Sequence, residues 1–259
     1  MSHIGEDHWN ASLYDRKHAF VSEYGNDLVT LLAPQKGEAI LDVGCGTGDL
    51  ANTLVELGVE VTGIDQSENM IQQASTKYPH IPFVVKNVLN LEFNNKFHAI
   101  FSNATLHWVK RPQVALNKMY NSLKTGGRFV AEFGGQGNVK LITDELINQL
   151  NLEGISYTDE QFPWYFPSIG EYSTLMEEAG FRVVFAQHFD RPTPLEGENG
   201  LRNWMDMFAG NLLASLTEDT RERIIFNVEN KLKKDLYKDG QWIADYKRLR
   251  VFGLKEAIS

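Results

Sequence analysis

The sequence predicts an α/β fold in which a mostly parallel sheet carries helices on both faces. Strand-like and helical patterns alternate strictly through the first half of the chain, which indicates right-handed βαβ units. A glycine-rich turn directly follows the first strand, where such sheets place a ligand site. With 42% apolar residues among 259, the chain can bury one large core. The strand-like runs are 39–43, 59–64, 81–85, 97–102 and 127–133, and the helical patterns between them are 49–57, 67–77 and 112–123.

The flanking segments extend this core. Apolar spacing predicts helices within 11–33 and at 139–150 and 170–179, and strands at 180–190 and 244–255. About fifty mostly helical residues separate the last two strands, which is too many for an ordinary connection. We therefore predict a single domain with a Rossmann-like, seven-stranded, mostly parallel sheet and helical lid insertions. The domain covers 1–259, with its core at 34–135, 168–191 and 244–259 and its insertions at 1–33, 136–167 and 192–243.

Bulk properties exclude several classes of function. The formal charge of −9 argues against a nucleic-acid substrate, because affinity for phosphate backbones comes from clustered Lys and Arg. The chain has no apolar run of about 18 residues, and its first residues lack the pattern of a secretion signal. Cys45 is the only cysteine, so neither an internal disulfide nor a zinc site is expected. We predict a cytoplasmic protein, a monomer or weak dimer, without metal, membrane or nucleic-acid partners.

A glycine loop and an acid form the strongest local signal. Gly44, Gly46 and Gly48 lie between a buried strand and an amphipathic helix, where glycine lets the backbone approach a ligand closely. Asp65 ends the next strand, where its carboxylate can accept hydrogen bonds from both ribose hydroxyls of an adenosine. The alternative is a capping box in the sequence DQSE, with Asp65 capping the next helix and Glu68 returning the bond. Together the loop and the acid predict a nucleoside site.

The nearest rival is a dinucleotide site of the NAD type. Its fingerprint GxGxxG/A needs a third small residue beside two phosphates. Here Asp49 occupies that place, and its carboxylate would repel the phosphates. A ligand with ammonium and sulfonium groups would instead suit the acidic residues, which include Asp42.

These segments resemble the successive motifs of class I S-adenosylmethionine (SAM)-dependent methyltransferases. The matching sequences are DVGCGTG at 42–48, GID at 63–65, FSNATLHWV at 101–109 and LKTGGRF at 123–129. Segments nearer the ends are similar to the trans-aconitate methyltransferase-like branch of small-molecule methyltransferases. They are WNASLYDRKHAFVSEYG, FPSIGEYSTLMEEAGFRV and RPTPLEGENGLRNWMDMF.

The resemblance implies SAM as the cofactor and a set of residues that bind it. It places Gly44, Cys45 and Gly46 at the methionine part, Asp65 at the ribose, and Asn103 near the transferred methyl. The adenine would meet Gln66, Asn87 and Val88. Many relatives have Asp where this chain has Asn87, whose alternative role is that of a turn residue.

His107 and Trp108 follow the fourth strand, at the edge of the sheet where ligands bind. His107 is the candidate catalytic base, because an imidazole can take a proton from a hydroxyl acceptor. A carboxylate acceptor is already ionised and needs no base, so His107 could equally contact a ligand or start a helix. Trp108 is a candidate acceptor contact.

The other candidate acceptor contacts lie in the lid segments. They are Tyr14 and His18 on one helical face, Trp164 and Phe166 in the loop FPWYFPS, and Tyr246. A strand period of two places Tyr246, Arg248 and Arg250 on one face, where the guanidiniums could hold a carboxylate. The structural alternatives are core packing for the aromatic residues and ion pairs with Asp190, Glu196 or Glu198 for the arginines.

The resemblance thus predicts methyl transfer from SAM to a small-molecule acceptor, with O-methylation of a carboxylate or hydroxyl leading. The alternatives are a SAM-binding protein without methyltransferase activity and an NAD-dependent oxidoreductase.

Overall fold

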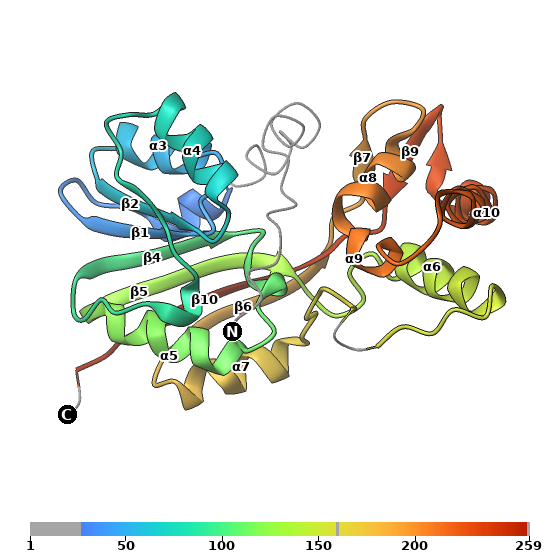
Figure 1. The fold of residues 1–259 in the computed structure, drawn as a ribbon. Helices are drawn as coiled ribbons and strands as arrows, with labels where there is room; N and C mark the ends of the chain where they lie inside the picture. Colours follow the sequence, from blue (N-terminus) through green and yellow to red (C-terminus); the bar gives the residue numbers. More distant parts are fainter. Residues whose placement is uncertain (1–26, 159–160, 258–259) are drawn as a thin grey trace, which may run out of the picture. The chain divides into compact units, whose positions relative to one another are not determined.

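The computed structural model describes residues 27–158 and 161–257. Seven strands form one sheet in the order β3-β2-β1-β4-β5-β10-β6 (Figure 1). The pairs β1–β2, β1–β4, β2–β3 and β4–β5 are all parallel, which confirms the predicted sheet. The strands are β1 Ala39–Val43, β2 Glu60–Asp65, β3 Phe83–Val85, β4 Phe97–Asn103, β5 Leu123–Gly134, β6 Arg182–Asp190 and β10 Lys247–Leu254.

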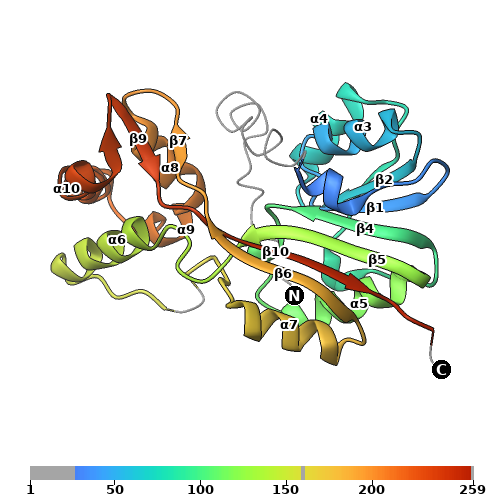
Figure 2. The same ribbon diagram turned by 180° about the vertical axis from the view of Figure 1, so that it is seen from behind.

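Helices cover both faces of this sheet, α3 and α4 on one side and α5 and α7 on the other, as the two opposite views agree (Figures 1 and 2). They are α3 Asp49–Glu56, α4 Glu68–Lys77, α5 Pro112–Ser122 and α7 Ile169–Glu178, each within two residues of its prediction. Sequence explains two of their starts. Ser67 caps α4 by accepting a hydrogen bond from the Met70 amide, and Pro112 occupies the first turn of α5. The capping-box alternative for Asp65 is therefore wrong, since the cap is Ser67.

The core lies around β1 and β4, the strands nearest the predicted ligand site. Four of the five β1 residues and six of the seven β4 residues are buried. Ile40, Ala99 and Phe101 pack there with Ala51 and Leu54 of α3. Strands buried on both faces read as continuous apolar runs, which is why the sequence placed them accurately.

The chain divides into two compact units, each with its own secondary structure. The first comprises residues 1–133, 167–187 and 249–259, and the second 134–166 and 188–248. In the second, the expected helices are joined by a three-stranded sheet, β7-β9-β8, that the sequence did not predict. Strands of two to four residues are too short to show an alternating pattern. The elements are α6 Lys140–Leu152, β7 Thr193–Leu195, α8 Gly200–Phe208, α9 Gly210–Leu213, α10 Glu218–Leu236, β8 Tyr237–Lys238 and β9 Gln241–Ala244.

The final predicted strand, 244–255, is two strands. β9 ends at Ala244 and β10 begins at Lys247, so Tyr246 lies in the break between them. Asp245 uses this break to bond the start of α6, its carboxylate accepting from the Leu141 amide at 2.8 Å. The predicted continuous strand is therefore wrong at Tyr246, although the guanidinium of Arg248 still lies beside the Tyr246 ring.

None of the helices in the described part of the chain has the length and hydropathy to span a membrane. Most of the predicted helix at 11–33 falls outside the described residues, and its described end, 27–32, is helical.

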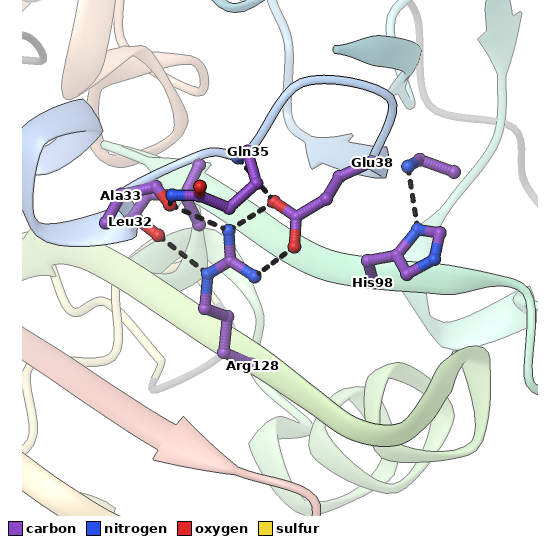
Figure 3. Close-up of polar contacts among 7 residues, drawn as sticks. Leu32, Ala33, Gln35, Glu38, His98 and Arg128 are labelled. Carbon is purple, nitrogen blue, oxygen red and sulfur yellow. Dashed lines mark hydrogen bonds and ion pairs between the residues drawn. The ribbon is translucent and has the colours of Figure 1, made fainter.

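Arg128 of β5 holds the end of this helix against the sheet (Figure 3). Its guanidinium donates to both carboxylate oxygens of Glu38, at 2.7 and 2.6 Å, and to the carbonyls of Leu32 and Ala33. The two side chains are only 15% and 17% exposed, so the pair is largely shielded from solvent. Beside it, the Ala39 amide donates to Nδ1 of His98 at 2.8 Å. The pKa of Glu38 is lowered, chiefly by its hydrogen bond to Arg128.

Arg128→Ala is expected to lower the free energy of unfolding by about 2–3 kcal/mol, because it removes the paired cation from a shielded carboxylate and a donor from each of two carbonyls. Glu38 stabilises the fold above its ordinary pKa of 4.5, and this contribution is lost as the pH falls. Urea unfolding between pH 3 and 7 should therefore show a shallower acid limb in the variant. Arg182→Ala removes the exposed pair with Glu256 and should change stability by less than about 1 kcal/mol. Equal losses in both variants would contradict this account.

Candidate functional site

A cavity of about 310 Å³ opens in the first unit at the carboxyl ends of β1, β2, β3 and β4. This is the place where open α/β sheets bind ligands. Its lining residues come from the ends of these strands and the segments that follow them. They are Val43, Gly44, Gly46, Ile64, Asp65, Gln66, Met70, Lys86, Asn87, Val88, Leu89, Asn103, Ala104, Thr105, Trp108, Val109, Lys110 and Arg111.

The three loop glycines have three different tasks. A Cβ on Gly44 would lie 2.0 Å from Oγ1 of Thr105, so Gly44 is needed for the loop after β4 to pack against it. Gly48 has φ +89° and precedes α3, and a Cβ there would lie 2.7 Å from the Phe83 ring. Gly46 also has a positive φ, of +53°, but a Cβ on it would meet nothing within 4 Å. Gly46 is therefore the glycine that leaves space for a ligand.

Asp65 is fixed by backbone donors on two sides. Its carboxylate accepts hydrogen bonds from the Gly46 amide at 3.1 Å and from the Ser67 amide at 2.9 Å. Each carboxylate oxygen has a further lone pair, so the group can also accept hydrogen bonds from a diol. A direct hydrogen bond thus joins the glycine loop to the acid, the two features that together predicted a nucleoside site.

Gln66 and Asn87 lie side by side at the cavity. The Asn87 amide donates to Oε1 of Gln66 at 3.2 Å, while its own oxygen accepts from the Leu89 amide at 2.9 Å. Asn87 thereby caps the short 3₁₀ helix η1, Val88–Asn90. The turn role that the sequence left open is present, and Asn87 lines the cavity as well.

Asp42 is buried behind the glycine loop, at 2% exposure. Its Oδ2 has no hydrogen-bond partner within the described residues. Burial, and next the charge of Asp65, raise its pKa to about 7. A cation held in the cavity would lower this pKa, because it would stabilise the ionised carboxylate.

Asp49 does not line the cavity, because its carboxylate is bound elsewhere. It accepts hydrogen bonds from Nζ of Lys77 and from the Tyr78 hydroxyl, both at 2.5 Å. The pKa of Tyr78 is raised to about 12, first by burial and then by Asp49. The charge of Asp49 is therefore compensated, and its expected repulsion of dinucleotide phosphates is not what sets the choice of cofactor.

The residues after β4 divide between the cavity and the interior. Asn103 and Trp108 line the cavity, whereas His107, only 7% exposed, does not. The His107 ring lies 5.4 Å from the Trp108 ring within the 3₁₀ helix η2, Leu106–Trp108. Cys45 is likewise buried outside the lining, and burial raises the pKa of its thiol. Neither the basic role of His107 nor a ligand contact by Cys45 gains support from these positions.

Three of the predicted acceptor contacts meet in the second unit. Trp164 and Phe166 stack at 5.8 Å, and Trp164 also packs against Trp204. Nε1 of Trp204 donates to the Tyr246 hydroxyl at 2.7 Å. Sequence reasoning did not single out Trp204, which joins the group. Trp164 is 4% exposed, which agrees with the packing alternative. Tyr14 and His18 lie outside the described residues.

The two arginines of β10 have different surroundings. Arg250 donates to Glu132, a fully buried acid of β5, at 2.8 and 2.6 Å. The guanidinium of Arg248 lies 5.2 Å from the centre of the Tyr246 ring. The prediction that Arg250 forms a structural ion pair is thus confirmed, but its predicted partners are wrong. Of these, Asp190 pairs with Lys247 instead. The lining also contains residues that the sequence did not suggest, namely Thr105, Lys86, Lys110 and Arg111.

Comparison with known proteins identifies the family. A methyltransferase-domain model matches residues 41–131. An uncharacterized methyltransferase of Schizosaccharomyces pombe is 33% identical over 97% of this chain and 99% of its own. The chain belongs to the methyltransferase family. A trans-aconitate 2-methyltransferase of Rhodopseudomonas palustris is 32% identical to it over 40% of each chain. Phosphoethanolamine N-methyltransferase 2 of Haemonchus contortus, solved with S-adenosyl-L-methionine, has a TM-score of 0.58 and 18% identity, covering 91% of this chain and 53% of that one.

Family membership confirms the predicted enzyme class and SAM as its cofactor, and sets the NAD alternative aside. The geometry and charge of the cavity also fit SAM, independently of the comparison with relatives. Gly46 leaves open space at the loop, and Asp65 can accept bonds from the ribose hydroxyls. Asp42 and Asp65 provide the acidic surroundings that suit a molecule with ammonium and sulfonium groups.

Alanine at two loop positions should separate packing from ligand binding. Gly46→Ala meets no protein atom, so it should cost about 1–2 kcal/mol for its left-handed backbone and lower the affinity for S-adenosylhomocysteine at least tenfold. Gly44→Ala should destabilise by more, because its Cβ displaces Thr105. Thermal unfolding and calorimetric titration measure the two effects. Unchanged S-adenosylhomocysteine affinity in Gly46→Ala would remove the loop from the binding site.

The raised pKa of Asp42 predicts a pH dependence with a definite sign. Stability from the neutral carboxyl is fully present below its ordinary pKa of 3.8 and is lost as the pH rises through about 7. SAM is a net cation and favours the ionised form of Asp42, so the affinity for SAM should rise between pH 6 and 8 with release of a proton. Asp42→Asn should flatten that rise, whereas Asp235→Asn on exposed helix α10 should not. Calorimetry in two buffers of different ionisation enthalpy measures the proton, and equal release by all three proteins would contradict the assignment.

Proposed function

We propose that this methyltransferase transfers the methyl group of SAM to a carboxylate oxygen of a small-molecule acceptor, with a hydroxyl oxygen as the second candidate. The trans-aconitate 2-methyltransferase noted above, whose name gives a carboxylate acceptor, is compatible with this choice.

The charges of the cavity lining carry the proposal. Its titratable side chains, among the described residues, are Asp65, Lys86, Lys110 and Arg111, with no histidine. A neutral hydroxyl must lose a proton during methyl transfer and profits from a base. A carboxylate is already anionic at neutral pH, and cationic walls favour its entry. A lining with cations and no imidazole therefore favours the carboxylate.

The protein's own contribution would be alignment. SAM supplies an electrophilic methyl group on a sulfonium that leaves as a neutral thioether. Asp65, held by the Gly46 and Ser67 amides, would fix the ribose, and Asn103 at the end of β4 would border the reacting region. Positioning two reactants in line can supply several kcal/mol of the barrier reduction without proton transfer.

The direct test incubates the protein with methyl-labelled SAM and matched panels of carboxylic acids, alcohols and amines. If mild base releases the label from the product as methanol, the product is a methyl ester. Transfer to alcohols or amines alone would contradict the carboxylate, and SAM binding without transfer to any panel would favour a binding protein that lacks turnover.

His107→Ala distinguishes the two oxygen acceptors. With a carboxylate, kcat should stay within about threefold of wild type at every pH, because no proton is moved. With a hydroxyl acceptor that relies on His107, kcat should fall at least a hundredfold and its pH dependence near the imidazole pKa should disappear. S-adenosylhomocysteine affinity serves as the control for folding, and the second outcome would restore the catalytic base.

A further inference from the structure

The cavity lining carries positive charge that the cofactor does not explain. Lys110 and Arg111 follow the 3₁₀ helix η2, and Lys86 follows β3, and all three line the cavity. The protein as a whole carries a formal charge of −9, so the adjacent Lys110 and Arg111, here called the basic wall, reverse the prevailing sign. We infer that Lys110 and Arg111 form a subsite for a second anionic group of the acceptor, a carboxylate or phosphate that is not itself methylated. This inference rests on the proposed function.

Arg111 is the centre of the subsite because its charge is available. Lys86 already pairs with Glu92, at 3.3 Å. Arg111 is exposed at the cavity and has no ion-pair partner within residues 27–158 and 161–257. A guanidinium presents a planar pair of donors that matches the two oxygens of a carboxylate or phosphate.

Stability alone does not account for this placement. Arg111 immediately precedes α5, and none of the residues in the first turn of α5 is acidic. The positive end of the helix dipole favours acids at such a position and disfavours cations. Two adjacent cations there repel each other as well, and residues that break a local rule in this way commonly serve a ligand.

The chemistry of the reaction requires that the anionic group bound by Lys110 and Arg111 is not the one that receives the methyl group. SAM carries a sulfonium and an ammonium against a single carboxylate, so it is a net cation and gains nothing overall from a basic wall. A carboxylate held by Arg111 and Lys110 would accept hydrogen bonds from their N–H groups, and with its lone pairs engaged it would attack a methyl group poorly. An acceptor that uses both the wall and the sulfonium therefore needs two anionic groups, one bound and one reacting.

Matched acceptors test the subsite. Methyl transfer to glutarate is compared with transfer to pentanoate, and 4-phosphonobutyrate replaces one carboxylate of glutarate by a phosphonate. Wild type should prefer the dianions at least thirtyfold in kcat/KM. Arg111→Ala should remove most of this preference through KM, Lys110→Ala part of it, and Arg111→Lys should restore some. A stronger effect on the phosphonate than on glutarate assigns the subsite to phosphate, and the reverse assigns it to carboxylate.

Lys118→Ala is the matched control, because Lys118 lies on α5 outside the cavity lining. It should leave all acceptors unchanged, and every variant should keep wild-type affinity for S-adenosylhomocysteine. Calorimetric titration of glutarate and pentanoate into the S-adenosylhomocysteine complex gives a second readout that does not need turnover, and it should show the same preference and the same loss in Arg111→Ala.

Three results would overturn the inference. They are equal use and equal binding of mono- and dianions by wild type, an Arg111→Ala variant that keeps the preference, and a fall in S-adenosylhomocysteine affinity in Arg111→Ala, which would assign the arginine to the cofactor carboxylate. Failure of the proposed function is a different result: no acid of any kind receives a methyl group, whatever the binding data show.

Discussion

The site depends on one constraint, the double anchoring of the Asp65 carboxylate. The Gly46 amide on one side and the Ser67 amide on the other hold it at the end of β2. The first bond fixes the loop after β1, and the second belongs to the turn that starts α4, so one carboxylate sets the spacing of two successive βα turns. A flexible acid at this place would lose side-chain entropy on binding a ligand, whereas the anchored one has already lost it.

The packing around the loop adds a second constraint, at Gly44. Gly44 must lack a side chain so that Thr105 can approach, and the Thr105 hydroxyl donates to the Asn103 carbonyl at 3.1 Å. The segments that follow β1 and β4 therefore contact each other, and Gly46 lines the cavity. Acidic groups, Asp42 and Asp65, lie toward this loop, while Lys110 and Arg111 line the segment after η2. A cavity with both signs of charge suits a reaction between a cationic donor and an anionic acceptor.

Charged residues differ most between what the sequence predicts and what the structure shows. The sequence predicts that the Asp49 carboxylate would repel dinucleotide phosphates, yet Lys77 of α4 and Tyr78 at the end of that helix bind it. The sequence suggests Asp190, Glu196 or Glu198 as partners of Arg250, yet its partner is Glu132, 118 positions away in the chain. Long charged side chains reach hydrogen-bond and ion-pair partners that are distant in the chain, and local sequence patterns do not predict them. The small sheet of the second unit was missed for another reason, since its strands are too short to have a period.

The sequence by itself determined the alternating core, the position of the glycine loop and the acid that follows it, and through them the family. These features are local: buried strands read as apolar runs, and a βα turn constrains its own residues. Tertiary structure decided which glycine faces open space, which of His107 and Trp108 reaches the cavity, and that Lys86 and Arg111 share one cavity. Those outcomes depend on the packing of segments that are distant in the chain. The strand, loop and acid could therefore be predicted, and the meeting of Lys86, Lys110 and Arg111 in one cavity lining could not.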